Sequence, residues 1–121
     1  MRSLDLAWER SKILRDWRRW AVKLRKAAEK VLSGNLSGTY IFGSAVKNRL
    51  VASSDIDVLI VARDLPKSLI KRSEVKEEIV RESGLPLIHP FEIHLVNEEE
   101  ARIYFRHVGR EFVKVEDLEG R

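Results

Sequence analysis

The sequence predicts a mixed α/β (α+β) domain, in which a short twisted sheet is covered by helices packed mainly on one face. Three observations lead to this expectation. Segments with a helical spacing of apolar residues alternate with short β-rich runs. The run over residues 55–62 is β-branched and almost continuously apolar after two acids, as in strands covered on both faces. The 121 residues are enough for one modest hydrophobic core.

The first segment, from about residue 6 to residue 32, has apolar residues at helical spacing and predicts one long helix with a basic opposite face. Gly34 and Asn35 are expected to end it, because glycine readily takes the left-handed conformation found after helices. Residues 1–30 carry ten Lys and Arg against four Asp and Glu, and so hold all of the positive excess. The basic face either contacts nucleic-acid phosphates or is simply solvated. The three tryptophans favour a packing surface for a partner or a second copy.

The rest of the chain predicts strands and helices in alternation. The expected elements are a strand over residues 39–42, a strand over 55–62, a helix over 67–83, a strand over 91–96 and a short helix from 98 to about 106. Asn97 is the expected N-cap of the last helix, whose first turn is acidic. Residues 112–115 fit either a last strand or a helix end. No repeat or linker divides the chain, so residues 1–121 are expected to form one domain, with the helix over 1–33 leading into a core over 39–96.

The composition excludes several classes of protein. The chain has no cysteine, which excludes disulfide frameworks, thiolate metal sites and cysteine nucleophiles. No apolar run reaches the length needed to cross a bilayer, and the charged N-terminus is unlike a signal peptide, so a cytoplasmic location is expected. Charged residues make up 35% of the chain and glutamine is absent, a balance typical of heat-adapted proteins.

Acidic residues mark two of the expected strands. Asp55 and Asp57 lie at positions i and i+2, so a strand would place them on one face. Their mutual repulsion and the cost of desolvating them favour a divalent cation such as Mg²⁺ between them. Glu92 adds a third carboxylate if its strand is a neighbour. His94 shares the face of Glu92, where it either lines a pocket or is simply exposed. Taken alone, the aspartate pair is more typical of acids that face water at the start of a strand.

Gly43 and Ser44 follow the first expected strand. A glycine at this position lets the backbone approach a ligand closely. A following serine can donate both its N–H and its hydroxyl to phosphate oxygens. A phosphate holder beside metal-binding carboxylates is the equipment for phosphoryl or nucleotidyl transfer with two metal ions.

The spacing of these residues resembles the signature of the DNA polymerase β nucleotidyltransferase superfamily, and in particular its small prokaryotic branch, the minimal nucleotidyltransferases (MNT). The matching pattern, within residues 39–96, is Gly43-Ser44, ten further residues, Asp55-Ile56-Asp57, and Glu92 in a later strand. Many relatives have a glycine and small polar residues between the two motifs, where this chain carries Lys47 and Arg49. Contact with phosphates and simple solvation explain these two side chains equally well.

The resemblance implies a nucleotidyltransferase-like fold and a role for each matching residue. Gly43 and Ser44 would bind the triphosphate of a nucleoside triphosphate. Asp55 and Asp57 would hold two Mg²⁺ ions, and Glu92 would complete the metal site that activates an acceptor hydroxyl. The implied reaction moves a nucleotide, expected to be AMP from ATP, onto that hydroxyl.

The acceptor is expected on another polypeptide, because larger relatives carry a further helical domain for which this sequence has no residues. In the family, MNT proteins are often paired with HEPN proteins as toxin–antitoxin modules, so the resemblance implies a HEPN-type partner, with a homodimer as the other possibility. The alternative function is a non-catalytic nucleotide-binding or antitoxin subunit that acts by protein–protein contact.

Overall fold

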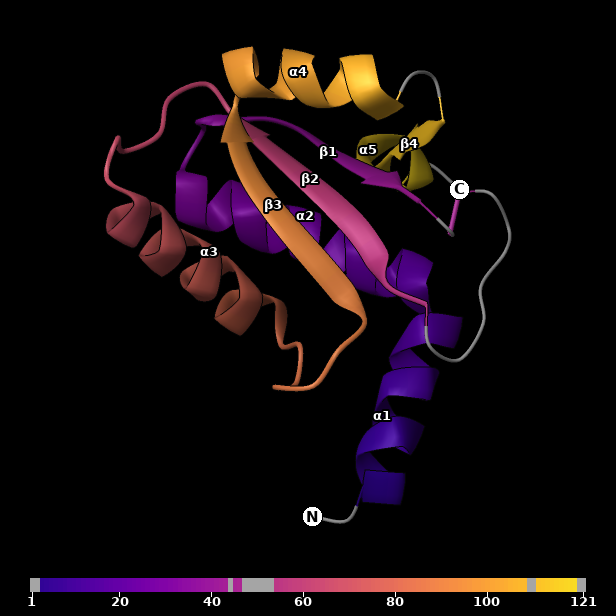
Figure 1. The fold of residues 1–121 in the computed structure, drawn as a ribbon. Helices are drawn as coiled ribbons and strands as arrows, with labels where there is room; N and C mark the ends of the chain where they lie inside the picture. The colour runs from indigo at the N-terminus through magenta and orange to yellow at the C-terminus, as the bar shows by residue number, and fades with distance from the viewer. Residues whose placement is uncertain (1–2, 44, 47–53, 109–110, 120–121) are drawn as a thin grey trace.

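The computed structural model describes residues 3–43, 45–46, 54–108 and 111–119 (Figure 1). Its elements in chain order are α1 (Ser3–Arg15), α2 (Trp17–Leu32), β1 (Leu36–Phe42), β2 (Ile56–Ala62), α3 (Leu69–Ser83), β3 (Phe91–Asn97), α4 (Glu98–Val108), β4 (Phe112–Lys114) and α5 (Val115–Leu118). All five expected elements after the first helix are present within a few residues of their expected bounds. The undecided tail forms a short strand followed by a short helix. None of the helices in these ranges is long and apolar enough to span a bilayer.

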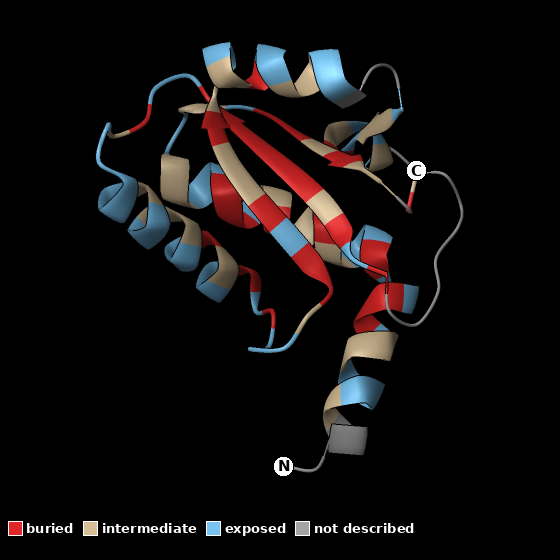
Figure 2. Ribbon diagram, viewed as in Figure 1, coloured by how far each residue is buried: buried red, intermediate tan, exposed pale blue. Residues whose placement is uncertain are grey.

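The four strands form one sheet in the order β3-β2-β1-β4. β2 pairs antiparallel with β1 and parallel with β3, and β4 pairs antiparallel with β1. Six of the seven residues of β2 are buried, and Figure 2 shows this strand buried along most of its length. The apolar run that predicted a strand covered on both faces is therefore at the centre of the sheet, as expected.

Alternation along β2 divides the core between the two faces of the sheet. Ile56, Val58 and Ile60 pack into the larger cluster with α2, α3 and α5, whereas Leu59 and Val61 pack with residues of α4. Figure 1 shows α2 and α3 on one side of the sheet and α4 on the other. The prediction of a mixed α/β domain with helices mainly on one face is confirmed.

The expected long N-terminal helix is divided in two at Asp16. This residue leaves helical geometry, with φ −105° and ψ 29°. α2 lies against the sheet, while α1 extends away from the body of the molecule (Figure 1). Ile13, Leu14 and Trp17 are buried around the break, so core contacts continue across it although the helical backbone does not. α2 ends where expected: Ser33 and Gly34 both take left-handed conformations after Leu32.

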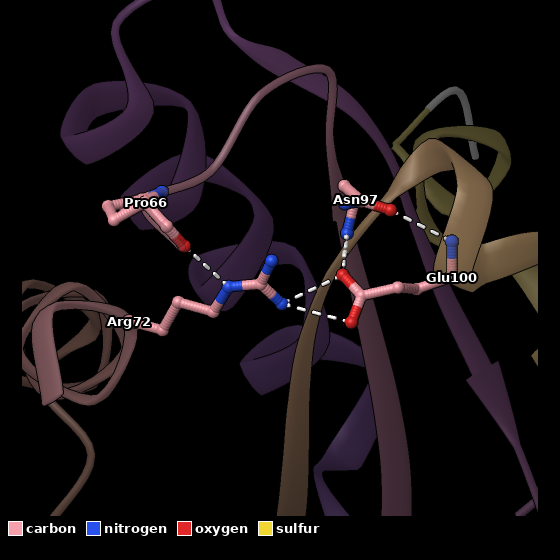
Figure 3. A network of polar contacts seen from close by, with 4 residues as sticks. All are labelled: Pro66, Arg72, Asn97 and Glu100. Atoms are coloured by element: carbon pink, nitrogen blue, oxygen red, sulfur yellow. Dashed lines mark hydrogen bonds and ion pairs between the residues drawn. The ribbon is translucent and has the colours of Figure 1, made fainter. Parts of the chain in front are cut away.

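A polar network joins α3 to the start of α4 (Figure 3). The side chain of Asn97 accepts a hydrogen bond from the Glu100 N–H at 2.8 Å, and Glu100 Oε1 accepts one from the Asn97 N–H at 3.0 Å. This reciprocal capping confirms Asn97 as the N-cap. Arg72 contacts both carboxylate oxygens of Glu100, at 2.7 and 3.0 Å, and donates to the Pro66 carbonyl at 2.8 Å. The hydrogen bond from Asn97, together with Arg72, holds the pKa of Glu100 below its ordinary value of 4.5.

We predict that Glu100→Gln lowers the free energy of unfolding by about 1 kcal/mol at neutral pH, because glutamine keeps the capping hydrogen bond but loses the ion pair with Arg72. The folded-state pKa of Glu100 is depressed, so its stabilisation is present above pH 4.5 and is lost as the pH falls through the lower folded pKa. Urea unfolding from pH 7 to pH 3 should show the two proteins converging at low pH. Glu99→Gln, in the same helical turn and exposed, is the matched control. A deficit in Glu100→Gln that persists at pH 3 would contradict this explanation.

Candidate functional site

The parallel pairing of β2 and β3 brings two acids together. Asp57 lies directly opposite Glu92 in the register of the two strands. Both side chains share the face covered by α4. Residues two positions apart on a strand lie on one face, so Asp57 lies on the face of Leu59 and Glu92 on the face of His94. They stand near the start of their strands, and the Glu92 side chain is 61% exposed. The sheet thus brings Asp57 and Glu92 into adjacent positions, as the strand pattern predicted.

His94 completes a compact group with these acids. Its Nε2 lies 3.5 Å from Asp57 Oδ1 and 3.9 Å from Glu92 Oε1. One ligand atom from each of the three residues lies within 4.8 Å of the other two. The other ring nitrogen, Nδ1, lies 3.2 Å from the Tyr104 hydroxyl, and the ring stacks on Phe42 at 6.2 Å between centroids. His94 therefore lines the site, which settles the alternatives that the sequence left open.

The surroundings of Asp57 disfavour the ionised form of its carboxyl group. Burial raises the pKa of this carboxyl above its ordinary value of 3.8, and the charge of Glu92 raises it further. The neighbouring His94 opposes the shift by hydrogen bonding and by its charge when protonated. A cation placed between the two carboxylates would offset both desolvation and repulsion.

Gly43 packs its backbone against this carboxylate. It follows β1 with φ +93°, a left-handed conformation that favours glycine. A Cβ at this position would lie 2.8 Å from Asp57 Oδ2, closer than carbon and oxygen can approach. Phe42 pairs with Asp57 across β1 and β2, which holds the glycine beside the acid. Within the described residues, the position of Gly43 thus has no room for a side chain beside Asp57.

Asp55 occupies a different environment from Asp57. It precedes β2, its side chain is 67% exposed, and its Oδ1 accepts a hydrogen bond from Arg10 Nη2 at 2.9 Å. The same nitrogen donates to the Ser54 carbonyl at 2.5 Å. Within the described part of the chain Asp55 does not belong to the close group of Asp57, Glu92 and His94. The structure brings together two of the three expected acids and places the third against α1.

Not every residue that the sequence points to lies in the described part of the chain. Ser44, Lys47 and Arg49 lie outside the described residues. The sequence pattern places His94 on the same face as Glu92 but does not decide between a pocket and an exposed position. No local pattern indicates a role for Arg10, because its partner Asp55 lies 45 positions later in the chain.

The residues present suit a divalent cation. Two carboxylates and an imidazole converge from adjacent strands, and their ligand atoms are close enough for one ion to contact all three. Carboxylate oxygens are the ligands that Mg²⁺ and Mn²⁺ prefer, and imidazole also binds Mn²⁺. The exposure of Glu92 leaves the group accessible from solvent. Asp57, Glu92 and His94 could therefore hold a divalent ion at a place that a phosphate or a hydroxyl could reach from solvent.

Comparison with known families gives a match over most of the chain. Residues 23–111 fit the family model described as polymerase beta, nucleotidyltransferase. The chain is 30% identical over 105 residues to spectinomycin 9-adenylyltransferase of Staphylococcus aureus, covering 83% of this chain and 40% of that protein. It is 37% identical over 59 residues to a candidate protein adenylyltransferase of Methanocaldococcus jannaschii, covering 49% of this chain and 40% of that protein. The chain thus spans about 40% of the length of these relatives.

Solved structures share the fold. A candidate nucleotidyltransferase from Sulfolobus solfataricus superposes with a TM-score of 0.53 at 24% identity, covering 80% of each chain. Another candidate nucleotidyltransferase superposes with a TM-score of 0.56 at 24% identity, covering 74% of this chain and 90% of the other. At this level of identity the likeness concerns the arrangement of helices and strands.

We predict that Gly43→Ala destabilises the protein and weakens binding of Mn²⁺, because the new methyl group carries both backbone strain and a clash with Asp57. Gly34→Ala is the matched control, since Gly34 also has a positive φ but no atom within 4 Å of an added Cβ. The strain alone should cost about 1–2 kcal/mol in both variants, measured by urea unfolding. Only Gly43→Ala should lose Mn²⁺ affinity in a calorimetric titration. Equal Mn²⁺ affinities in the two variants would show that Gly43 does not position Asp57.

Proposed function

We propose that this chain, which belongs to the polymerase β nucleotidyltransferase family, transfers a nucleotide from a nucleoside triphosphate to an acceptor hydroxyl. The observation that carries the proposal is the pairing of Asp57 with Glu92 in the register of parallel strands, beside the left-handed Gly43. Two acids in adjacent positions are costly unless a cation joins them. Backbone that turns tightly next to such a pair is suited to phosphate oxygens.

The nucleotide proposed is AMP, taken from ATP. Both named relatives are called adenylyltransferases, one acting at position 9 of spectinomycin and the other a candidate that acts on protein. The sequence identities, 30% and 37%, favour the same donor for this chain. We favour a protein acceptor, in line with the relative from Methanocaldococcus jannaschii and with the resemblance to MNT proteins.

The proposed chemistry is a single displacement at the α-phosphorus. A bond forms between the acceptor oxygen and the α-phosphorus while the bond to the bridging α–β oxygen breaks, and pyrophosphate leaves. The hydroxyl proton passes to the Glu92 carboxylate, whose exposure leaves it within reach of an acceptor. Asp57, which is more deeply placed, holds its position between Gly43 and His94.

Asp57 and Glu92 would hold Mg²⁺ in this proposal, with His94 beside them and Asp55 as a further ligand. Bound Mg²⁺ supplies positive charge that neutralises the triphosphate and the leaving pyrophosphate. To hold a second ion, Asp55 would have to give up its ion pair with Arg10. Gly43 and Ser44 would bind the triphosphate through their N–H groups and the serine hydroxyl.

The acceptor hydroxyl is proposed to belong to a HEPN-type partner protein, with this chain as the antitoxin of the pair. Its support is the resemblance of the Gly43-Ser44 and Asp55-Ile56-Asp57 motifs to the MNT branch. In that arrangement adenylylation of the partner would neutralise it.

A second candidate function is neutralisation by contact alone. The ion pair between Arg10 and Asp55 favours it, because one of the expected metal ligands is engaged by a side chain of α1. A binding subunit would keep the fold and the partner surface without needing Asp55 for metal.

We predict that the protein transfers label from [α-³²P]ATP to the product of the adjacent reading frame in the presence of Mg²⁺. Asp57→Asn and Glu92→Gln should each reduce the transfer by about a hundredfold or more, because each removes a charge that the metal site requires. Asp117→Asn, an exposed acid on α5, is the control and should retain full transfer. If Asp57→Asn neutralises the partner as well as the unmodified protein does, the contact-only function is correct and the transferase proposal is wrong.

A further inference from the structure

We infer that the outer edge of β3 is the docking site for an extended segment of the acceptor polypeptide, which would bind as an added strand in the groove between β3 and α3. This inference rests on the proposed function, because it states where the acceptor of that reaction binds. The occupant is a β-strand segment that carries an acidic residue and a hydroxyl residue.

The backbone of β3 supplies the first argument. β3 is the outermost strand of the sheet, with α3 beside it (Figure 1). The Pro90 carbonyl accepts a hydrogen bond from the Ile56 N–H at 2.7 Å, so the backbone groups of even-numbered residues point to β2. Because successive residues of a strand point their N–H and carbonyl groups to opposite edges, the odd-numbered residues point outward. The outward N–H groups are those of Phe91, Ile93, Leu95 and Asn97.

Side chains satisfy the outward N–H groups at both ends of the strand. The Phe91 N–H donates to His89 Nδ1 at 3.1 Å, and the Asn97 N–H donates to Glu100 Oε1 at 3.0 Å. In the described part of the chain no acceptor is found for the Ile93 and Leu95 N–H groups between them. The two N–H groups without an acceptor lie between two N–H groups that side chains already satisfy. They form a site of defined length to which an extended peptide can hydrogen-bond.

A groove runs along this edge. Four consecutive residues of β3, 93–96, line it, although alternate side chains of a strand lie on opposite faces. A groove lined by both odd-numbered and even-numbered residues must therefore lie beside the edge of the strand and not over one face. The facing wall consists of one side of α3, with residues at helical spacing: Leu69, Arg72, Ser73 and Lys76. Its volume is about 370 Å³.

The polar network of Figure 3 holds one end of the groove in place. Arg72 reaches from α3 to Glu100 at the start of α4, past the end of β3. This bridge joins the two helices that border the groove. A contact that is already made before a segment binds reduces the ordering cost of association.

The groove is continuous with the candidate catalytic group. His94 lines the groove and also lies 3.9 Å from Glu92, so the two sites share a side chain. On a strand added beside β3, the residue opposite Glu92 would have its Cβ about 4.5–5.5 Å from that of Glu92. A serine, threonine or tyrosine at that position would bring its hydroxyl to the carboxylate proposed to receive the proton.

Charge determines the kind of segment that fits. The carboxylate of Glu100 matches the charge of Arg72, whereas within the described ranges no carboxylate lies within 4.0 Å of Lys76 Nζ. An acidic residue on the docked segment would pair with Lys76. Leu69, 78% exposed at the same wall, offers an apolar contact.

The test uses two synthetic peptides of about eight residues, in which valine and glutamine alternate around one tyrosine; one carries a glutamate and the other a lysine. Binding is read from the exchange rates of backbone amides in ¹⁵N spectra, which do not depend on activity. The acidic peptide should slow exchange at Ile93 and Leu95 and should bind about two- to fivefold more tightly than the basic one. Lys76→Glu should reverse this preference. Lys71→Glu, on the opposite side of α3, should leave it unchanged.

Label transfer from [α-³²P]ATP to the tyrosine of each peptide separates this inference from the proposed function. Protection of the two amides, with no label transferred either to the peptides or to the product of the adjacent reading frame, would contradict the transferase proposal and leave the docking edge intact. Label transfer without protection, or equal binding of the two peptides, would overturn the docking edge. Protection of Ile93 and Leu95 before any peptide is added, together with a dimer in light scattering, would assign the edge to a second copy and would also overturn the inference.

Discussion

The repulsion between Asp57 and Glu92 is the constraint on which the rest of the site depends. Parallel pairing of β2 with β3 fixes the two carboxylates opposite each other, and the buried strand that carries Asp57 prevents its retreat into water. Burial and the charge of Glu92 raise the pKa of Asp57, which is the cost of keeping the pair without a cation. Gly43 and His94 enclose the same carboxylate from β1 and β3. A fold that maintains such an arrangement is well prepared for a divalent ion.

Local patterns were enough to predict most of the fold and the places of two of the three expected acids. The apolar run of β2 and the alternation of β3 were confirmed, and so was the capping role of Asn97, because each depends on neighbours in sequence. The division of the first helix at Asp16 was missed, since the apolar spacing continues across it. The ion pair of Asp55 with Arg10 could not be foreseen either, because it depends on where α1 lies relative to β2.

Two features of the structure indicate from which side each substrate would reach the site. On one side, Arg10 of α1 pairs with Asp55, which lies outside the group formed by Asp57, Glu92 and His94. On the other side, the open edge of β3 leads from that group along α3 toward the Arg72–Glu100 bridge. A triphosphate arriving near Gly43 and an acceptor arriving along β3 would meet at Glu92 from opposite sides. That separation is what an in-line displacement at phosphorus requires.

A crystal structure with Mn²⁺ and a non-hydrolysable ATP analogue would show whether Asp57 and Glu92 bind one ion, because the anomalous signal of manganese locates the ion without reference to activity. We expect a peak about 2.1 Å from carboxylate oxygens of both Asp57 and Glu92, with the analogue's phosphates beside Gly43. A peak elsewhere on the molecule, with both carboxylates free of the ion, would contradict this expectation.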